Sequence, residues 1–202
     1  MMSSGGEPTE GLHAIVLAAG ASTRFGSIKQ LVRVGGRPLL HTTVGRAVDV
    51  AGSAVTVVLG AHAGELAPLL SHSPASVLVN REWREGIASS IRAAVTRLSP
   101  GCSAALLILA DQAAVTVEDL KRLVEAWRRQ PDYIVAARYA AMTGVPAIFP
   151  RASFGDLLAL RGDSGARQLL QRNPDRVVRV AMPSAAIDID TPEDLLALEP
   201  QK

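Results

Sequence analysis

A loop of small and basic residues follows the first apolar segment of the chain. Residues 17–31 read LAAGASTRFGSIKQL. Small residues let a ligand approach the backbone, and the N–H groups of such a loop can hold phosphate. Arg24 would add a two-pronged donor and Lys29 a point charge, and both suit a polyphosphate. The loop lacks the patterns of a Walker loop and of a dinucleotide-binding turn, so a glycine turn with solvated basic residues stays open as the alternative.

Acidic residues follow two other segments of strand length. Asp111 comes directly after the apolar residues 104–110, where a carboxylate can hold a cation, although a turn aspartate is the alternative. Asp188 and Asp190 precede a helix start, and their spacing places them on one side of an extended segment. Mg²⁺ is usually bound by one or two carboxylates together with substrate phosphates. A magnesium ligand at Asp111 with a second one in the later pair is one interpretation, and a turn aspartate with a pair that only caps the helix is the other.

Apolar segments of strand length alternate with segments of helical periodicity, and these elements must position the loop and the carboxylates. Strands are expected over residues 13–18, 54–59, 76–79, 104–109, 133–137, 145–149 and 176–181. Helices are expected over residues 39–50, 63–70, 86–98, 117–129 and 162–172, with a final one starting at Thr191. Continuous apolar runs indicate strands that are covered on both faces. We therefore predict a three-layer α/β/α fold with a mostly parallel, Rossmann-like sheet and ligands at the carboxyl ends of its strands.

Composition and charge narrow the class of protein. A chain of 202 residues, 48% hydrophobic and 20% charged, suits a single domain over residues 12–202 after a flexible tail over residues 1–11. A net charge of +2 without a Lys/Arg run gives no reason to expect a nucleic-acid partner. The chain shows neither an apolar stretch that could span a bilayer nor a secretory signal, so we expect a cytoplasmic protein without a membrane partner. The single cysteine, Cys102, excludes a disulfide framework.

Several motifs occur together in an order that resembles one enzyme family. Besides the first loop and Asp111, the chain carries NREWREGIASSI at residues 80–91, GVPAIF at 144–149, LRGDSGAR at 160–167 and DIDTPED at 188–194. This order resembles the nucleotidyltransferases with a molybdopterin-guanine-dinucleotide-synthase-like fold, which is of the nucleotide-diphospho-sugar transferase type. Within them it is most similar to the molybdenum cofactor cytidylyltransferases. The resemblance covers about residues 14–196.

The resemblance implies residues that contact the nucleotide. Those at the matching motif positions are Leu17, Ala18, Ala19, Gly20, Arg24, Lys29, Gly86 and Ser90. Arg24 and Lys29 would hold the triphosphate and act as the catalytic cations. Ala19 stands where GTP-using members have a second glycine, and this form of the loop resembles that of the CTP-using members. Trp83 could stack on the base or pack at the edge of the core.

The resemblance also implies a metal site and an acceptor side. Asp111 and Asp190 would hold Mg²⁺ as the cofactor. Gly144, Asp163 and Arg167 would lie toward the acceptor. The family usually has a proline two residues after its metal aspartate, whereas Ala113 stands here, and alanine does not fix the backbone as proline does.

The implied reaction is the Mg²⁺-dependent transfer of a nucleoside monophosphate, CMP from CTP, to the phosphate of a molybdopterin-type cofactor, with release of pyrophosphate. A molybdoenzyme could receive the product. Two alternatives stay open. One is a cytidylyltransferase that acts on another phosphorylated small molecule, and the other is a non-catalytic nucleotide- or cofactor-binding maturation factor for molybdoenzymes.

Overall fold

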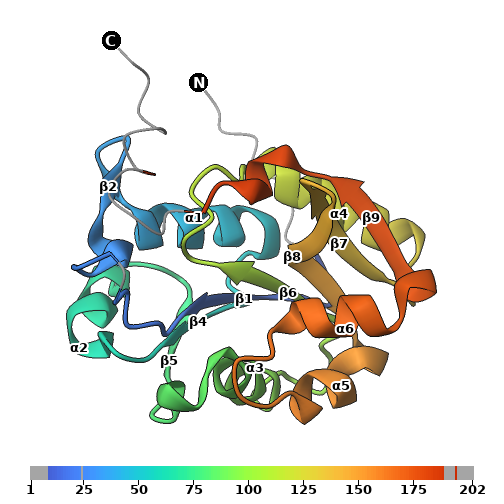
Figure 1. Cartoon of the computed structure of the whole chain (residues 1–202), viewed down its shortest axis with the longest axis horizontal. Helices are drawn as coiled ribbons and strands as arrows, with labels where there is room; N and C mark the ends of the chain where they lie inside the picture. Colours follow the sequence, from blue (N-terminus) through green and yellow to red (C-terminus); the bar gives the residue numbers. More distant parts are fainter. Residues whose placement is uncertain (1–8, 24, 189–193, 195–202) are drawn as a thin grey trace.

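The computed structural model describes residues 9–23, 25–188 and 194, and strands form a central sheet through this part of the chain (Figure 1). The strands of the sheet are β1 (Leu12–Ala18), β4 (Val55–Leu59), β5 (Ser76–Val79), β6 (Ala104–Leu109), β7 (Ile134–Tyr139), β8 (Met142–Pro150) and β9 (Val177–Ala181). Their order across the sheet is β5-β4-β1-β6-β8-β7-β9. Among these described strands, only β8 runs antiparallel to its neighbours. The prediction of a mostly parallel sheet is therefore confirmed.

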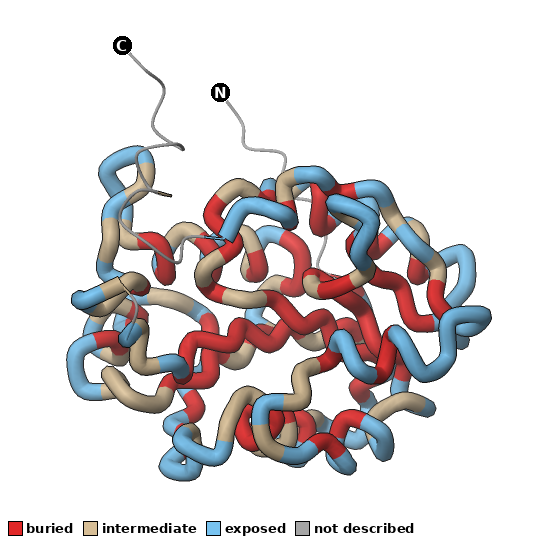
Figure 2. Tube along the Cα trace, viewed as in Figure 1, coloured by how far each residue is buried: buried red, intermediate tan, exposed pale blue. Residues whose placement is uncertain are grey.

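Helices cover both faces of the sheet and complete the three layers. One layer contains α1 (Leu39–Ala51), α2 (Ala63–Leu66) and α4 (Val117–Arg129), and the other contains α3 (Ile87–Val95), α5 (Phe154–Ala159) and α6 (Ala166–Arg172). Val16 of β1 is buried in a cluster with Leu40 of α1 and Leu123 of α4. Its neighbour Ile15 faces the other layer and clusters with Ile91 of α3. The sheet is buried between the two layers, as the continuous apolar strands predict (Figure 2).

Local signals explain where the best-predicted helices begin and end. Thr116 caps α4 through a reciprocal pair of hydrogen bonds with Asp119, and the helix spans the predicted residues. Helix α1 ends at Ala51 and is followed by Gly52, whose φ of +61° favours glycine. The expected helix over residues 63–70 is instead α2 followed by a 3₁₀ turn that begins with Ala67-Pro68. Proline lacks the N–H that a continuing helix needs, which accounts for the difference.

Other elements differ from the sequence prediction or lie outside it. The short helix α5 and the hairpin of β2 (Arg33–Val34) with β3 (Arg37–Pro38) were not expected. The final helix expected from Thr191 and most of the expected tail lie outside the described residues. Thr9, within the expected tail, is buried, and its N–H donates to Val50 O (3.4 Å). No described helix has the length and apolar character needed to cross a membrane.

The sheet topology brings the chemical residues of the sequence together. Strands β1 and β6 are parallel neighbours, and Leu17 pairs with Leu109 near their carboxyl ends. The loop after β1 and Asp111 after β6 therefore emerge side by side. Strand β4 flanks β1 on its other side, so the segment that starts at Gly60 emerges beside the same loop.

Candidate active site

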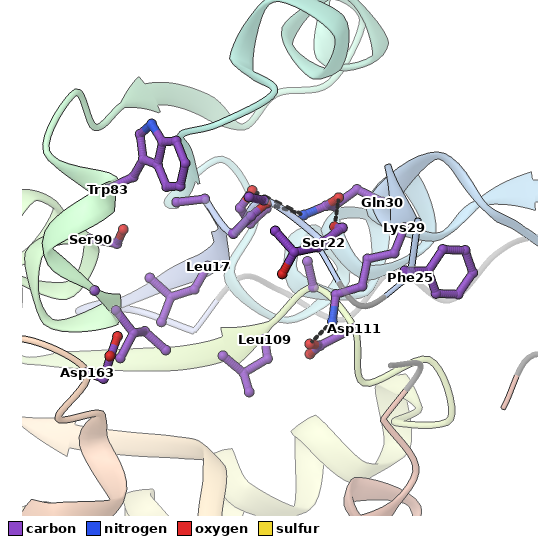
Figure 3. Close-up of a pocket in the computed structure, with 18 of the residues that line it drawn as sticks. Leu17, Ser22, Phe25, Lys29, Gln30, Trp83, Ser90, Leu109, Asp111 and Asp163 are labelled. Carbon is purple, nitrogen blue, oxygen red and sulfur yellow. Dashed lines mark hydrogen bonds and ion pairs between the residues drawn. The ribbon is translucent and has the colours of Figure 1, made fainter. Parts of the chain in front are cut away.

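A cavity of about 490 Å³ lies at the carboxyl ends of β1 and β6 (Figure 3). Its walls come from the loop after β1, the segment that leads from the 3₁₀ turn η3 (Trp83–Glu85) into α3, the end of β6, and the turn before α6. The described residues that line it are Leu17, Ala18, Ala19, Gly20, Ala21, Ser22, Thr23, Phe25, Lys29, Gln30, Trp83, Arg84, Gly86, Ile87, Ser90, Leu109, Ala110, Asp111 and Asp163.

Most residues proposed from the sequence for a site line this one cavity. On the nucleotide side these are Leu17, Ala18, Ala19, Gly20, Lys29, Gly86 and Ser90. Asp111 and Asp163 line it as well, whereas Gly144 and Arg167 are not among the lining residues. Arg24 and Asp190 lie outside the described residues.

Lys29 and Asp111 form an ion pair within the cavity. Lys29 opens the 3₁₀ turn η1 (Lys29–Leu31), and its Nζ lies 2.7 Å from Asp111 Oδ2. Among the described atoms, Asp111 Oδ1 is buried and has no hydrogen-bond partner. An oxygen left in this state costs free energy, and a carboxylate oxygen is a ligand that a hard divalent cation prefers. Asp111 therefore fits the metal role that the sequence predicts.

The segment after Asp111 is held from three directions although it lacks the family's proline. The N–H of Ala113 donates to Asp111 O (2.9 Å), and Arg46 Nη1 of α1 donates to Ala113 O (2.8 Å). Gln112 Nε2 donates to Val145 O (3.0 Å) and to Ala185 O (3.1 Å). These hydrogen bonds thus restrain the backbone around residue 113, which a proline ring would otherwise restrain.

Asn80 positions the first turn of α3 at the cavity. Its buried Nδ2 donates to Ser89 Oγ (2.8 Å) and to Ser90 Oγ (3.0 Å). Its Oδ1 accepts the N–H of Glu82 (3.0 Å). The asparagine of the 80–91 motif thereby fixes the serine that lines the cavity.

Gly86 permits a close approach that brings Asp163 to the site. Gly86 stands at the start of α3 with a φ of +110°, and a Cβ here would lie 2.4 Å from Gly162 O. The N–H of Ala88 donates to the same carbonyl (3.1 Å). The turn that carries Asp163 is therefore packed directly against α3, so the two motifs that supply Gly86 and Asp163 meet.

Gly144 lies against Tyr139 of β7, and the charge of Arg167 acts on the ionisation of the same tyrosine. A Cβ at Gly144 would lie 2.5 Å from Tyr139 Oη, so the ring occupies the space beside this glycine. Burial raises the pKa of Tyr139, and the charges of Asp188 and Asp111 raise it further, while Arg167 lowers it.

Two polar residues line the cavity although no sequence pattern marks them. Gln30 is 3% exposed and directly follows Lys29. Arg84 stacks on the half-buried Trp83, with its Cζ 4.5 Å from the ring centroid. Only their position next to the motif residues Lys29 and Trp83 could have indicated from the sequence that they line the site. The ring of Trp83 lies at the cavity wall opposite Lys29 (Figure 3).

Comparison with known proteins places this cavity within a family. Residues 14–177 match the MobA-like NTP transferase domain. Nicotine blue oxidoreductase of Paenarthrobacter nicotinovorans is 29% identical, covering 91% of this chain and 94% of that protein. Molybdenum cofactor cytidylyltransferase of Escherichia coli strain K12 is 22% identical, covering 92% and 94%. The structure of Rv0371C in complex with manganese, from Mycobacterium tuberculosis H37Rv, matches with a TM-score of 0.78 at 28% identity, over 94% of this chain and 98% of that one.

The family match extends from β1 to the first residue of β9 and includes the loop after β1, Asp111 and the start of α3. The order of the strands, the two helical layers and the cavity at the strand ends agree with a fold of the nucleotide-diphospho-sugar transferase type. The chain therefore belongs to the MobA-like NTP transferase family and is a nucleotidyltransferase.

Proposed function

We propose that this enzyme transfers CMP from CTP to the phosphate of a molybdopterin-type cofactor and releases pyrophosphate. The observation that carries the proposal is the Lys29–Asp111 pair, which stands in one cavity with the small-residue loop. The similarity to a molybdenum cofactor cytidylyltransferase over 92% of the chain supports this choice of reaction. The small Ala19 in the loop supports CTP as the donor.

In the proposed reaction, an oxygen of the acceptor phosphate attacks the α-phosphorus of CTP. The bond from the α-phosphorus to the bridging oxygen of the β-phosphate breaks, and its electrons leave with pyrophosphate. Such a transfer needs positioning and charge neutralisation rather than covalent participation by the protein. Lys29 would neutralise charge on the leaving group, together with Arg24. The N–H groups of the loop after β1 would orient the phosphates.

Asp111 would hold the divalent cation, with Asp190 as the proposed second ligand. Bound there, Mg²⁺ would supply positive charge to the phosphates of the nucleotide. The buried, unpartnered Oδ1 of Asp111 supports this role. A structurally similar protein forms a complex with manganese, which supports a divalent metal in this site without selecting magnesium.

The acceptor would lie toward Asp163, Gly144 and Arg167. Asp163 lines the same cavity as Lys29, and Arg167 offers a cation for a phosphorylated acceptor. We further propose that residues 12–202 act as one nucleotidyltransferase domain in the cytoplasm, and that a molybdoenzyme receives the product.

Pyrophosphate release tests the proposal directly. The enzyme would be assayed with CTP, GTP, ATP and UTP in turn, with Mg²⁺ and a molybdopterin-type acceptor. We expect release with CTP and a cytidylylated product. Release only with a different phosphorylated acceptor would support the first alternative. Nucleotide binding without release with any acceptor would support a maturation factor.

A further inference from the structure

Four successive carbonyl groups, from the last residue of β1 to residue 21, accept hydrogen bonds from Gln30 and from the segment after β4. Gln30 Nε2 donates to Ala18 O (3.5 Å) and to Gly20 O (3.4 Å). The N–H of Ala61 donates to Ala19 O (3.1 Å). His62 Nε2 lies 3.2 Å from Ala21 O. No carbonyl from residue 18 to residue 21 is left without a donor.

Holding these carbonyls also fixes the N–H groups of the loop. The C=O of one residue and the N–H of the next belong to a single planar, trans peptide, in which the two groups point in opposite directions. Four fixed carbonyls at residues 18–21 therefore orient the N–H groups of residues 19–22. These residues line the cavity, where N–H groups can hold phosphate.

Both the nitrogen and the oxygen of the Gln30 amide bind residues of this loop. Gln30 is buried at 3% exposure, and its Oε1 accepts the hydroxyl of Ser22 (3.1 Å). The amide thus ties together three alternate positions of the loop, namely 18, 20 and 22, as the dashed lines of Figure 3 show. The two donors and one acceptor that it uses are a combination that neither glutamate nor methionine offers.

The segment after β4 holds the loop from a second direction. A Cβ at Gly60 would lie 2.5 Å from Ala19 O and 2.7 Å from Trp83 Cβ, so only glycine allows this approach. His62 must carry a proton on Nε2 to donate to Ala21 O, and its Nδ1 stands 4.0 Å from Glu65 Oε1. The hydrogen bond to the carbonyl thus selects one tautomer of the ring.

We infer that Gln30 and His62 are positioning residues, which hold the N–H groups of residues 19–22 toward the phosphates of the nucleotide. The inference rests on the proposed function for the identity of the ligand, but it does not depend on the acceptor or on turnover. Each residue acts through the loop, and its contribution should appear in phosphate binding rather than in recognition of the base.

Calorimetric titration with three ligands tests this inference: Mg·CTP, pyrophosphate with Mg²⁺, and cytidine. We expect Gln30→Met and His62→Phe each to weaken binding of CTP and of pyrophosphate about five- to tenfold, the effect of one lost neutral hydrogen bond. Cytidine binding should stay unchanged. His62→Gln, which keeps a side-chain N–H, should recover part of the loss. Gln168→Met and His41→Phe, at exposed positions away from the cavity, are the matched controls.

Several results would overturn the inference. One is equal loss of affinity for cytidine and for pyrophosphate, which would indicate general damage to the fold. Another is unchanged pyrophosphate binding in both His62→Phe and Gln30→Met. Absence of pyrophosphate and CTP binding in the unaltered enzyme would also reject it. Conversely, tight phosphate binding with the expected losses, but without turnover on any acceptor, would uphold the inference and reject only the proposed reaction.

Discussion

Lys29 and Asp111 stand 82 positions apart in the sequence, yet Lys29 Nζ lies 2.7 Å from Asp111 Oδ2. A divalent cation bound by the same carboxylate would compete with this ammonium, because like charges repel strongly at such short range. Nucleotide phosphates offer Lys29 another anionic partner. Metal and nucleotide should therefore each bind more tightly in the presence of the other, since the nucleotide draws Lys29 away from Asp111 and the metal releases Lys29 to the phosphates.

Replacing Lys29 separates its effect on turnover from its effect on metal binding at Asp111. Lys29→Ala should lower turnover about a hundredfold or more, because a charge that stabilises the leaving group is lost. The same change should strengthen binding of Mn²⁺ in the absence of nucleotide, because the competing ammonium is gone. Turnover is measured as pyrophosphate release, and Mn²⁺ binding by its paramagnetic signal. Lys121→Ala, at an exposed position on α4, is the control, and near-normal turnover in Lys29→Ala would remove Lys29 from the mechanism.

Gly86→Ala should destabilise the protein. The new side chain would meet Gly162 O at 2.4 Å, in a backbone conformation with a φ of +110°. We expect the free energy of unfolding to fall by about 1–3 kcal/mol, measured by urea denaturation. Gly45→Ala, in α1 with no atom outside the surrounding helix backbone within 4 Å of the new Cβ, should instead raise it by about 0.5–1 kcal/mol. Equal stability of the two variants would contradict the close packing at Gly86.

Arg46→Met should loosen the segment after Asp111. Methionine retains the aliphatic part of the arginine side chain but lacks the guanidinium group that donates to Ala113 O (2.8 Å). We expect the free energy of unfolding to fall by about 1 kcal/mol, and the Mg²⁺ concentration for half-maximal turnover to rise. The exposed Arg172→Met provides the control. An unchanged Mg²⁺ requirement would show that this contact does not position Asp111.

His13 should make stability depend on pH. Burial lowers the pKa of His13, whose Nε2 lies 2.8 Å from Thr56 Oγ1. The unfolded chain protonates this histidine near its ordinary pKa of about 6.5, whereas the folded chain resists protonation. The contribution of the neutral His13 to the free energy of unfolding is therefore complete above about pH 6.5. It is lost as the pH falls through the lowered pKa of the folded state.

Urea denaturation at about pH 7.5 and about pH 5.5 measures this loss on both sides of the ordinary histidine pKa. His13→Gln should show a smaller fall in the free energy of unfolding between the two than the unaltered protein. His72→Gln, at an exposed position, should behave like the unaltered protein. Equal pH dependence in all three would exclude His13 as the cause.

Elements whose signals are local were predictable from the sequence. Helix α4 has the predicted residues because Thr116 caps it and its apolar positions recur at helical spacing. The core strands were found within one or two residues at most ends because their apolar runs are continuous. The hairpin of β7 with β8 shows the limit, since its residues 138–139 and 142–144 form no continuous apolar run and adopt strand structure only through backbone pairing between the two strands.

Some residues of the site were likewise predictable from the sequence, and others were found only in the structure. Lys29, Asp111 and Gly86 belong to motifs, and the structure brings them to one cavity. The role assigned to Gln30 and His62 follows only from their hydrogen bonds to carbonyls of residues 18–21, and the sequence does not encode such pairings in its spacing.

The two tryptophans of the chain differ in a way that is useful for measurement. Trp127 of α4 is 6% exposed and packs in the core, while Trp83 lines the cavity beneath the guanidinium of Arg84. Indole fluorescence depends on the polarity and charge around the ring. A nucleotide that enters the cavity should therefore change the emission of Trp83 and leave the emission of Trp127 nearly constant. A Trp127→Phe chain would therefore carry a single intrinsic optical probe at its own site, which allows ligand arrival to be followed in stopped flow without a label.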